Sequence, residues 1–149
     1  MVIRDIMTRT VVTAATHTPV REVAEIMRER NVGGVVLCGE DGAPVGFITD
    51  RDVAVIVVAG GCDPAASALD HASTPVVTGD SGMDLREAAT LMARFGIRRL
   101  PVLEDGRLAG IVTLDDIAVR TADPELQSHL TATITRSALP EFYFHQRGG

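Results

Sequence analysis

The sequence contains two copies of one unit, and this internal repeat constrains the fold more than any other feature. A shift of 65 positions places Val11-Val12-Thr13 on Val76-Val77-Thr78. After a one-residue deletion the shift becomes 64, and Asp41-Gly42 falls on Asp105-Gly106. Matches at a fixed spacing indicate a repeated structural unit. We therefore divide the chain into a first unit at residues 1–61, a second unit at 62–121, and a C-terminal helix and tail at 122–149.

Each copy predicts the element order β-α-β-β-α. Apolar residues recur with the spacing of a helix that buries one face, at positions 20, 23, 24 and 27 and again at 85, 88, 89 and 92. We expect the first helix to begin at Thr18-Pro19, with the threonine as its N-cap, and its counterpart to begin at a capping box of Ser81 and Asp84. A second helix in each copy is expected to begin at Asp50 and at Leu114.

Short apolar runs predict three strands in each copy, at 11–13, 34–38 and 45–49 and at 76–78, 99–103 and 108–113. The last two strands of each copy flank an Asp-Gly pair, which is typical of a hairpin. Apolar residues make up 46% of the chain and aromatic residues only 3%, so an aliphatic core between thin layers is expected. A unit of about 60 residues buries little surface alone. The sequence therefore predicts an α/β (α+β) fold in which two units pack sheet to sheet with pseudo-two-fold symmetry and form paired grooves.

The most informative match is a strand that ends in threonine, opens a helix, and is followed by an aspartate three residues later. It runs from Gly46 to Thr49 and Asp52 in the first copy, and from Gly110 to Thr113 and Asp116 in the second. The amide groups at a helix N-terminus suit a phosphate, and a carboxylate one turn in can accept from ribose hydroxyls. The glycine lets another backbone or a flat base approach closely. The same pattern is also an ordinary capping box, and both interpretations stay open.

Together with the run from Gly96 to Val102, the two units resemble a tandem pair of cystathionine-β-synthase (CBS) domains over residues 1 to 121. The resemblance implies a non-enzymatic regulatory module that binds AMP, ADP, ATP, NAD or S-adenosylmethionine in its clefts, with no required cofactor. It implies a homodimer that signals through its own assembly or to an effector protein. The residues that it assigns to ligand binding are the ribose-side Asp52 and Asp116, the phosphate-side Thr49 and Thr113, and the phosphate-contacting Arg98 and Arg99. The alternative is a ligand-free interaction scaffold with degenerate clefts.

The two copies differ at one pair of positions, because the first has Gly33-Gly34 where the second has Arg98-Arg99. Successive strand residues point to opposite faces, so at most one of the two arginines is expected to face any one cleft. We expect the cleft of Asp116 to be the better anion-binding site, with Arg51 as a substitute cation beside Asp52.

Charge and hydropathy exclude several other classes of function. The net charge is −6 and no basic run is present, which argues against nucleic-acid binding. No apolar run approaches the roughly 20 residues of a membrane span. The first seven residues carry an acid and lack the apolar core of a targeting segment, so we expect a cytoplasmic protein. Cys38 and Cys62 are then expected to be reduced thiols, with a regulatory disulfide as the alternative.

No catalytic or metal-binding residues are predicted. The sequence Gly79-Asp80-Ser81-Gly82 is similar to a serine-protease nucleophile loop, but no base and orienting group accompany it. The histidines show no ligand spacing, at His17, His71, His129 and His145. After Asp123 an amphipathic helix is expected through Leu126, Leu130 and Ile134, ended by Pro140, and the aromatic residues at 142–144 are expected to contact a second copy or a partner.

Overall fold

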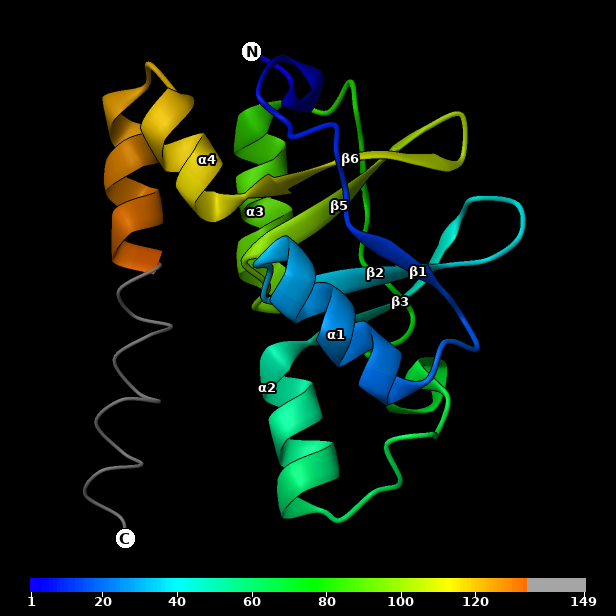
Figure 1. The fold of residues 1–149 in the computed structure, drawn as a ribbon. Coiled ribbons are helices and arrows are strands. Elements are labelled where there is room, and N and C mark those ends of the chain that lie inside the picture. The colour runs from blue at the N-terminus through cyan, green and yellow to red at the C-terminus, as the bar shows by residue number, and fades with distance from the viewer. Residues whose placement is uncertain (134–149) are drawn as a thin grey trace, which may run out of the picture.

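The computed structural model describes residues 1–133 and contains the predicted order of elements in both units (Figure 1). The first unit holds β1 (Thr13–Ala15), α1 (Val20–Arg30), β2 (Gly34–Cys38), β3 (Pro44–Thr49) and α2 (Asp50–Val53), which continues as the π-helical segment η2 (Ala54–Ala59). The second unit holds β4 (Gly79–Asp80), α3 (Leu85–Phe95), β5 (Arg99–Glu104), β6 (Arg107–Thr113) and α4 (Leu114–Arg120). A further helix covers residues 124–133.

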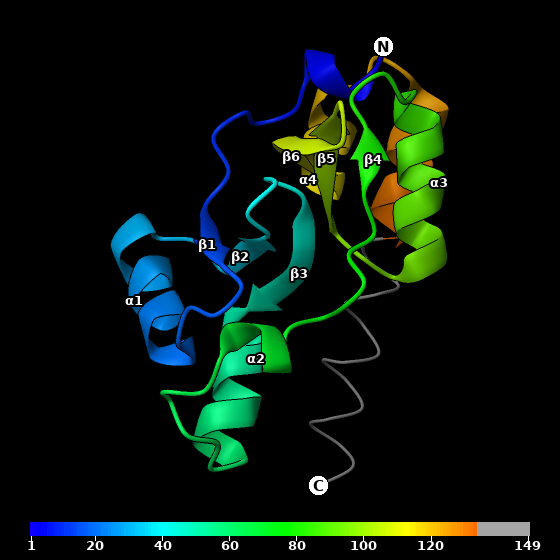
Figure 2. The same cartoon turned by 90° about the vertical axis from the view of Figure 1, so that its right-hand side faces the viewer.

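Each unit forms a three-stranded sheet with the same topology. In the first sheet the order is β1-β2-β3, with β1 parallel and β3 antiparallel to β2. The second sheet repeats this pattern as β4-β5-β6. The two sheets lie one above the other in both ribbon views (Figures 1 and 2). The prediction of two α/β units is confirmed.

Both Asp-Gly pairs form the hairpin turns that the sequence predicts. In the second unit Asp105 and Gly106 have φ values of 51° and 76°, and Glu104 pairs with Arg107 across them. Positive φ at both central residues is the signature of a tight type I′ connection. In the first unit Gly42 has a φ of 79° and closes a longer loop. The hairpins fix the register of the strands that lead to Thr49 and Thr113.

The helix starts of α1 and α3 differ from the sequence prediction. Thr18 is not the N-cap of α1, because Pro19 takes that position in an extended conformation and bridges to Ser67. The N-cap of α3 is Asp84, whose carboxylate accepts from the amide of Arg86 at 2.8 Å, so the predicted capping box with Ser81 is wrong.

The first strand of each unit also starts later than predicted. The strands are Thr13–Ala15 and Gly79–Asp80 rather than 11–13 and 76–78. The valine pairs of the predicted strands, at 11–12 and 76–77, instead line cavities between the units.

The two units exchange the short segments that precede them. The 3₁₀ turn η1 (Ile3–Asp5) docks on the second unit, where the amides of Ile3 and Arg4 each donate at 2.9 Å to the carbonyls of Met83 and Ser81. The turn η3 (Ala68–His71) docks on the first unit, where the Ala68 amide donates to the Thr18 carbonyl at 2.9 Å. Figure 2 shows the N-terminal turn on the side of β4 and α3, away from α1. The loop that is similar to a protease motif therefore serves as a docking site for the N-terminal segment.

Each hydrophobic core includes residues from the segment that docks on its unit. The core of the second unit contains Ile3, Ile6 and Met7 from the start of the chain, together with Leu126 and Leu130 from the helix 124–133. The core of the first unit contains Ala68, which follows the predicted unit boundary. Burial of Leu126 and Leu130 confirms the amphipathic helix up to residue 133, while Ile134, Pro140 and the aromatic residues 142–144 lie outside the described residues.

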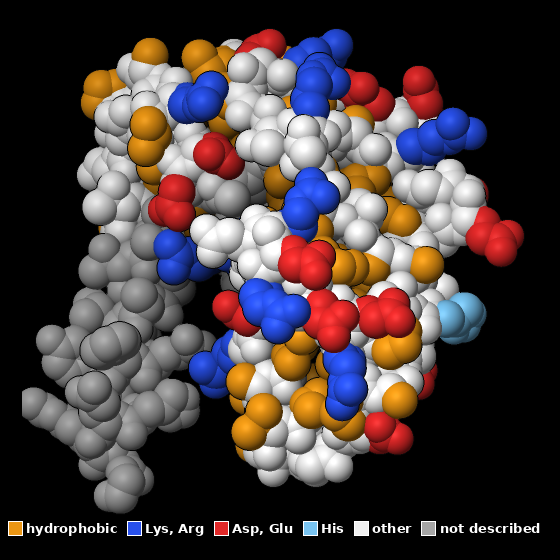
Figure 3. Space-filling model, in the orientation of Figure 1, with side chains coloured by type: hydrophobic (Ala, Val, Ile, Leu, Met, Phe, Trp, Pro, Cys, Tyr) orange, Lys and Arg blue, Asp and Glu red, His pale blue; other side chains and the backbone are white. Residues whose placement is uncertain are grey.

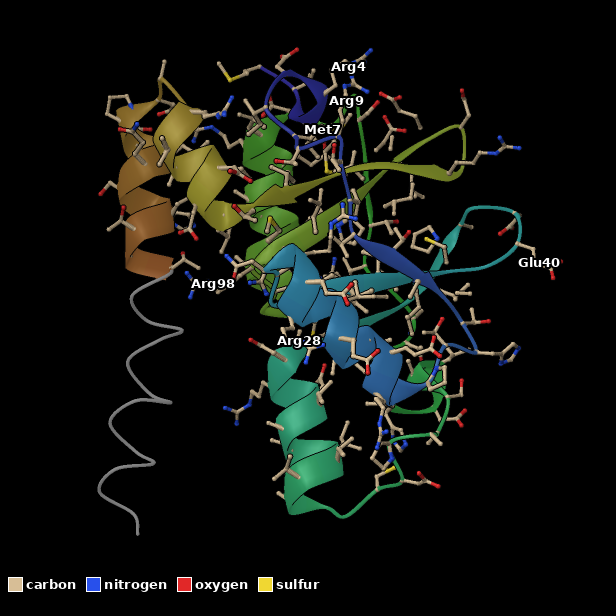
Figure 4. The ribbon with its side chains drawn as sticks, viewed as in Figure 1. Arg4, Met7, Arg9, Arg28, Glu40 and Arg98 are labelled. Atoms are coloured by element: carbon tan, nitrogen blue, oxygen red, sulfur yellow. The ribbon has the colours of Figure 1, made fainter. Side chains whose placement is uncertain are left out.

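The repeated glycine of β3 and β6 makes room for the exchanged segment. A Cβ atom on Gly110 would lie 2.6 Å from the Met7 sulfur and 2.9 Å from the Thr8 carbonyl oxygen, and Met7 lies over β6 in Figure 4. A Cβ atom on Gly46 would lie 3.1 Å from the Ala72 methyl group. Of the two roles that the sequence left open for this glycine, the structure shows the close approach of another chain segment.

Candidate functional site

Thr49 and Asp52 form a complete capping box at the start of α2, and Thr113 and Asp116 form its equivalent at the start of α4. The Thr49 hydroxyl accepts from the Asp52 amide at 3.2 Å, and the Asp52 carboxylate accepts from the Thr49 amide at 2.8 Å. In the second unit the corresponding distances are 3.0 and 2.9 Å. These reciprocal bonds fix both side chains at the ends of β3 and β6.

The capping role leaves each carboxylate with spare capacity. Asp52 and Asp116 use Oδ2 for the cap, and within residues 1–133 their Oδ1 atoms accept no hydrogen bond. An ionised carboxylate offers about four lone-pair sites over its two oxygens. Both side chains are half-buried. Each aspartate can therefore cap its helix and accept from a hydroxyl-bearing ligand at the same time.

Asp52 opens into a cleft with a volume of about 290 Å³, which we call the Asp52 cleft. Its lining combines an apolar wall with polar and cationic groups: Phe47, Thr49, Asp52, Ser73, Pro75, Val76, Val77, Ile97, Arg98, Arg99 and Pro101. The volume lies near the lower end of the range of small-molecule sites, and the mixture of apolar surface with a few polar groups is typical of them. The arrangement can hold a flat apolar group, a hydroxylated group and an anion together.

A second cleft of about 340 Å³ contains Asp116 and is called the Asp116 cleft. It is lined by Thr8, Thr10, Val11, Val12, Asn31, Val32, Gly33, Gly34, Val36, Phe47, Arg99, Ile111, Thr113 and Asp116. Every residue that lines the Asp52 cleft has a counterpart here, 65 positions earlier or 64 positions later in the sequence. The predicted equivalence of the two grooves is therefore visible residue by residue.

Each cleft takes its parts from both units, so the arginine pair is not confined to the cleft of Asp116. Arg98 and Arg99 line the Asp52 cleft together with the threonine and aspartate of the other unit, and Arg99 also lines the Asp116 cleft. The Asp116 cleft has Gly33 and Gly34 at the equivalent positions. The arginine pair was expected to serve the Asp116 cleft because each unit was assumed to complete its own cleft. The Arg98 guanidinium pairs with Asp115, which lines neither cleft, and the Arg99 guanidinium lies beside Gly33 of the Asp116 cleft. The expectation that at most one arginine faces any one cleft therefore stays a prediction.

The amides at the start of α2 are already occupied. The Asp50 amide donates to the Gly33 carbonyl at 3.0 Å, the Arg51 amide to the Asp50 carboxylate at 2.9 Å, and the Asp52 amide to Thr49. The predicted phosphate contact with free helix amides is therefore wrong for this cleft. An anion in the Asp52 cleft must rely on the guanidinium groups instead.

The two arginines differ in how firmly they are held. Arg98, labelled in Figure 4, lies 3.6 Å from the Asp115 carboxylate in a solvent-exposed ion pair, and such pairs contribute little. For Arg99 no carboxylate of the described chain comes within ion-pair distance. Arg51 is exposed and lines neither cleft, so its position does not suit the substitute role predicted for it.

The remaining polar groups do not form a second centre in the described part of the chain. Figure 3 shows acidic and basic side chains interspersed on this face rather than gathered into a basic field. Cys38 and Cys62 are free thiols, and Cys62 Sγ lies 3.0 Å from His71 Nε2. Burial, with a contribution from the Asp41 carboxylate, raises the pKa of the Cys38 thiol. Among residues 1–133 no group of three or more histidine, cysteine or acidic side chains is placed to hold a metal ion.

Comparison with known proteins decides the family. A sequence profile of the CBS domain matches twice, at residues 3–59 and 67–122. The chain belongs to the CBS domain family. It is 39% identical over 132 residues to the protein MK0525 of Methanopyrus kandleri, covering 87% of this chain and 64% of that protein. It is 33% identical over 137 residues to hypoxic response protein 1 of Mycobacterium tuberculosis, covering 91% of this chain and 96% of that protein.

Solved structures of CBS-domain pairs have the same fold. Hypoxic response protein 1, solved with two coordinated zinc ions, has a TM-score of 0.74 at 34% identity, covering 81% of this chain and 99% of that one. PAE2072 of Pyrobaculum aerophilum in complex with AMP gives 0.74 at 25% identity, covering 89% and 99%. The CBS pair of MJ0100 with 5′-methylthioadenosine and S-adenosyl-L-methionine gives 0.70 at 26% identity, covering 80% and 94%. No helix within residues 1–133 is long and apolar enough to cross a membrane.

Proposed function

We propose that this CBS pair is a non-enzymatic regulatory module that binds an adenosine nucleotide in the Asp52 cleft. The observation that carries the proposal is the combination, in one cleft, of the free Asp52 Oδ1, an apolar wall, and the arginine pair of the opposite unit. These groups match the ribose hydroxyls, the base and the phosphate of one ligand. The complexes of PAE2072 with AMP and of MJ0100 with adenosine derivatives support this choice of ligand class.

The charges of the residues that line the Asp52 cleft favour some adenosine ligands over others. Two arginines, Arg98 and Arg99, line the Asp52 cleft, and Asp52 is the one residue of the lining that carries a negative charge. Guanidinium groups bind phosphate oxygens with charge-assisted hydrogen bonds. The cleft therefore favours AMP, ADP, ATP or NAD over 5′-methylthioadenosine, which has no phosphate, and over S-adenosylmethionine, whose sulfonium is positive.

A thermal-shift series with AMP, ADP, ATP, NAD, S-adenosylmethionine and 5′-methylthioadenosine tests the proposal. A ligand at 100 times its dissociation constant adds about 2.7 kcal/mol, which raises the unfolding midpoint by about 5–10 °C for a chain of this size. We expect a phosphorylated ligand to give such a shift and Asp52→Ala to remove most of it. Absence of a shift with every ligand in the series would contradict the proposal.

Asp52→Ala also removes a helix cap, so its effect on the apo protein needs a matched control. Asp84 caps α3 with a bond of 2.8 Å and lines neither CBS cleft. Loss of either cap is expected to lower stability by roughly 1 kcal/mol. The Asp84→Ala variant should therefore lose apo stability and keep the full ligand-induced shift. Asp52→Ala should lose apo stability and keep only the part of the shift that binding in the Asp116 cleft provides.

The proposal includes a homodimer and signalling through it or to an effector protein. Val55 and Val58 on η2 are 53% and 81% exposed, and Val119 on α4 is 80% exposed. Hydrophobic side chains are visible over α2 and η2 in Figure 3. Exposed aliphatic side chains gathered on paired elements of the two units suit a contact with a second copy. Cytoplasmic location remains part of the same proposal.

The alternative is a scaffold of the same fold that binds no ligand. The capping boxes favour it, because they give Thr49, Asp52, Thr113 and Asp116 a complete structural role without a nucleotide. The thermal-shift series separates the two functions, since the scaffold predicts no stabilisation by any adenosine compound.

A further inference from the structure

The two clefts share a wall. Beyond the residues related by the repeat, the Asp116 cleft contains Asn31, Phe47 and Arg99, and the last two also line the Asp52 cleft. Phe47 comes from the first unit and Arg99 from the second. A residue that lines two cavities can make its best contact with a ligand in only one of them at a time.

The Phe47 ring is a fixed part of this wall. It packs on the backbone of Gly34, where a Cβ atom would lie 2.7 Å from the ring carbon Cζ. The ring thus fills the space that a side chain at position 34 would occupy. A ring packed this closely against a strand backbone has little room to move.

Arg99 is the part of the wall that can change its position. Its side chain starts from β5 in the Asp52 cleft and extends to Gly33 in the Asp116 cleft, where a glycine Cβ atom would lie 3.6 Å from Arg99 Nη2. The residue is exposed, and no ion pair within residues 1–133 holds its guanidinium. Rotation about its side-chain bonds is sufficient to direct the guanidinium into either cleft.

The two clefts differ in the number of arginines that line them. The Asp52 cleft has Arg98 in addition to Arg99, whereas Arg99 is the one lysine or arginine that lines the Asp116 cleft. A phosphate in the Asp52 cleft that recruits Arg99 therefore leaves the Asp116 cleft without its cation. Thermodynamic linkage makes the effect reciprocal, so a phosphate in the Asp116 cleft weakens binding in the Asp52 cleft by the same factor.

We propose that Arg99 is a shared phosphate-binding residue that couples the two clefts negatively, so that a phosphorylated nucleotide in one cleft lowers the affinity of the other. This inference rests on the proposed binding of adenosine nucleotides. The coupling limits the chain to one tightly bound phosphorylated nucleotide. Adenosine has no phosphate and does not require Arg99, so its binding to one cleft should not affect the other.

Site-resolved titration followed by amide ¹H–¹⁵N NMR measures the coupling. The amides of Asp52 and Asp116 report separately on their clefts. In the wild-type protein AMP fills one cleft before the other. With Asp52→Ala, AMP should bind to the Asp116 cleft about fivefold or more tightly than it does in the wild-type protein, because Arg99 is no longer recruited elsewhere. Adenosine should bind to the Asp116 cleft equally in both proteins.

Arg99→Gln and Arg98→Gln form a matched pair of variants. In the Arg99→Gln background the gain caused by Asp52→Ala should disappear, while in the Arg98→Gln background it should remain. If the gain persists without Arg99, repulsion between two bound phosphates explains it and the proposed role of Arg99 is wrong. Unchanged or weaker AMP binding to the Asp116 cleft in Asp52→Ala also contradicts the coupling.

Adenosine binding keeps this test independent of the proposed function. Both arginine variants should bind adenosine as the wild-type protein does, which shows that the clefts are intact. Failure of AMP and adenosine to bind to either cleft of the wild-type protein would instead refute the proposed function on which the coupling depends.

Discussion

Replacement of Gly110 by alanine tests whether the repeated glycine serves the exchange of segments between the units. The new methyl group would lie 2.6 Å from the Met7 sulfur and 2.9 Å from the Thr8 carbonyl oxygen. Real Cβ atoms do not approach other heavy atoms so closely, and one of the two contacts is to backbone. Overpacking of this kind costs about 1–3 kcal/mol.

Urea unfolding of Gly110→Ala and Gly46→Ala measures the effect. A methyl group on Gly46 would meet the Ala72 and Leu69 side chains at 3.1 Å, and these can yield by a few tenths of an ångström. We therefore expect a clear loss of unfolding free energy for Gly110→Ala and a smaller one for Gly46→Ala. Gly96→Ala is unsuitable as a control because Gly96 has a φ of 63°.

A double-mutant cycle with Met7→Ala identifies the contact that is responsible. Met7 is buried in the core of the second unit, so its truncation alone is destabilising. If the new methyl group clashes with Met7, the two changes should be less than additive, with a coupling of about 0.5–3 kcal/mol. Wild-type stability for Gly110→Ala would refute the steric role of Gly110, and strict additivity in the cycle would assign the clash to the Thr8 carbonyl and not to Met7.

Three other predictions follow from single residues. Because burial raises the pKa of the Cys38 thiol, iodoacetamide at pH 8 should modify Cys38 more slowly in the native than in the urea-unfolded protein, as followed by peptide mass spectrometry. The Leu126 amide, and then Arg86, lower the pKa of Asp123 below its ordinary 3.8. The stability that Asp123 contributes is therefore present above that value and lost as the pH falls through the lowered pKa, and Asp123→Ala should flatten this part of a stability–pH profile. Val58→Glu should shift sedimentation equilibrium towards the monomer, and an unchanged mass would argue against the η2 surface.

Much of the fold is readable because it depends on local patterns. The spacing of 65 residues, the helical stripe that includes Val20 and Met27, and the Asp105-Gly106 turn each specify an element without knowledge of its neighbours. The starts of α2 and α4 were also predictable, since the Thr-x-x-Asp pattern is itself the helix-capping signal. One prediction that failed concerns a position where a distant segment intervenes, since Pro19 forms a bridge with Ser67 and is the N-cap of α1.

The exchange between units left almost no trace in the sequence. The segments η1 and η3 are too short to show periodicity, and their positions depend on hydrogen bonds to residues such as Ser81 and Thr18 that are far away in the chain. The shift of 65 positions also places Asp5 on Asp70, which is a signal that these segments are equivalent parts of the units.

The composition of the clefts was predictable, but their pairing was not. The predicted threonine and aspartate of each copy lie at the start of its second helix: Thr49, Asp52, Thr113 and Asp116. The arginines do lie beside the start of α4 in their own unit, because Arg99 pairs with Thr113 across β5 and β6. Their sequence positions give no sign that both also line the cleft of Asp52 from the other unit.

Direct localisation of a bound nucleotide tests whether the two CBS units form the nucleotide site together. Titration of the ¹⁵N-labelled protein with AMP should shift the amide resonances of Thr49 and Asp52, and at the same AMP concentration those of Arg98 and Arg99 from the opposite unit. Asp52→Ala should abolish the shifts of Thr49 and Arg98, which line the Asp52 cleft alone, and Asp84→Ala should preserve them. Binding of AMP without shifts in both groups, or an AMP titration that leaves every resonance unchanged, would contradict a nucleotide site built from the two CBS units together.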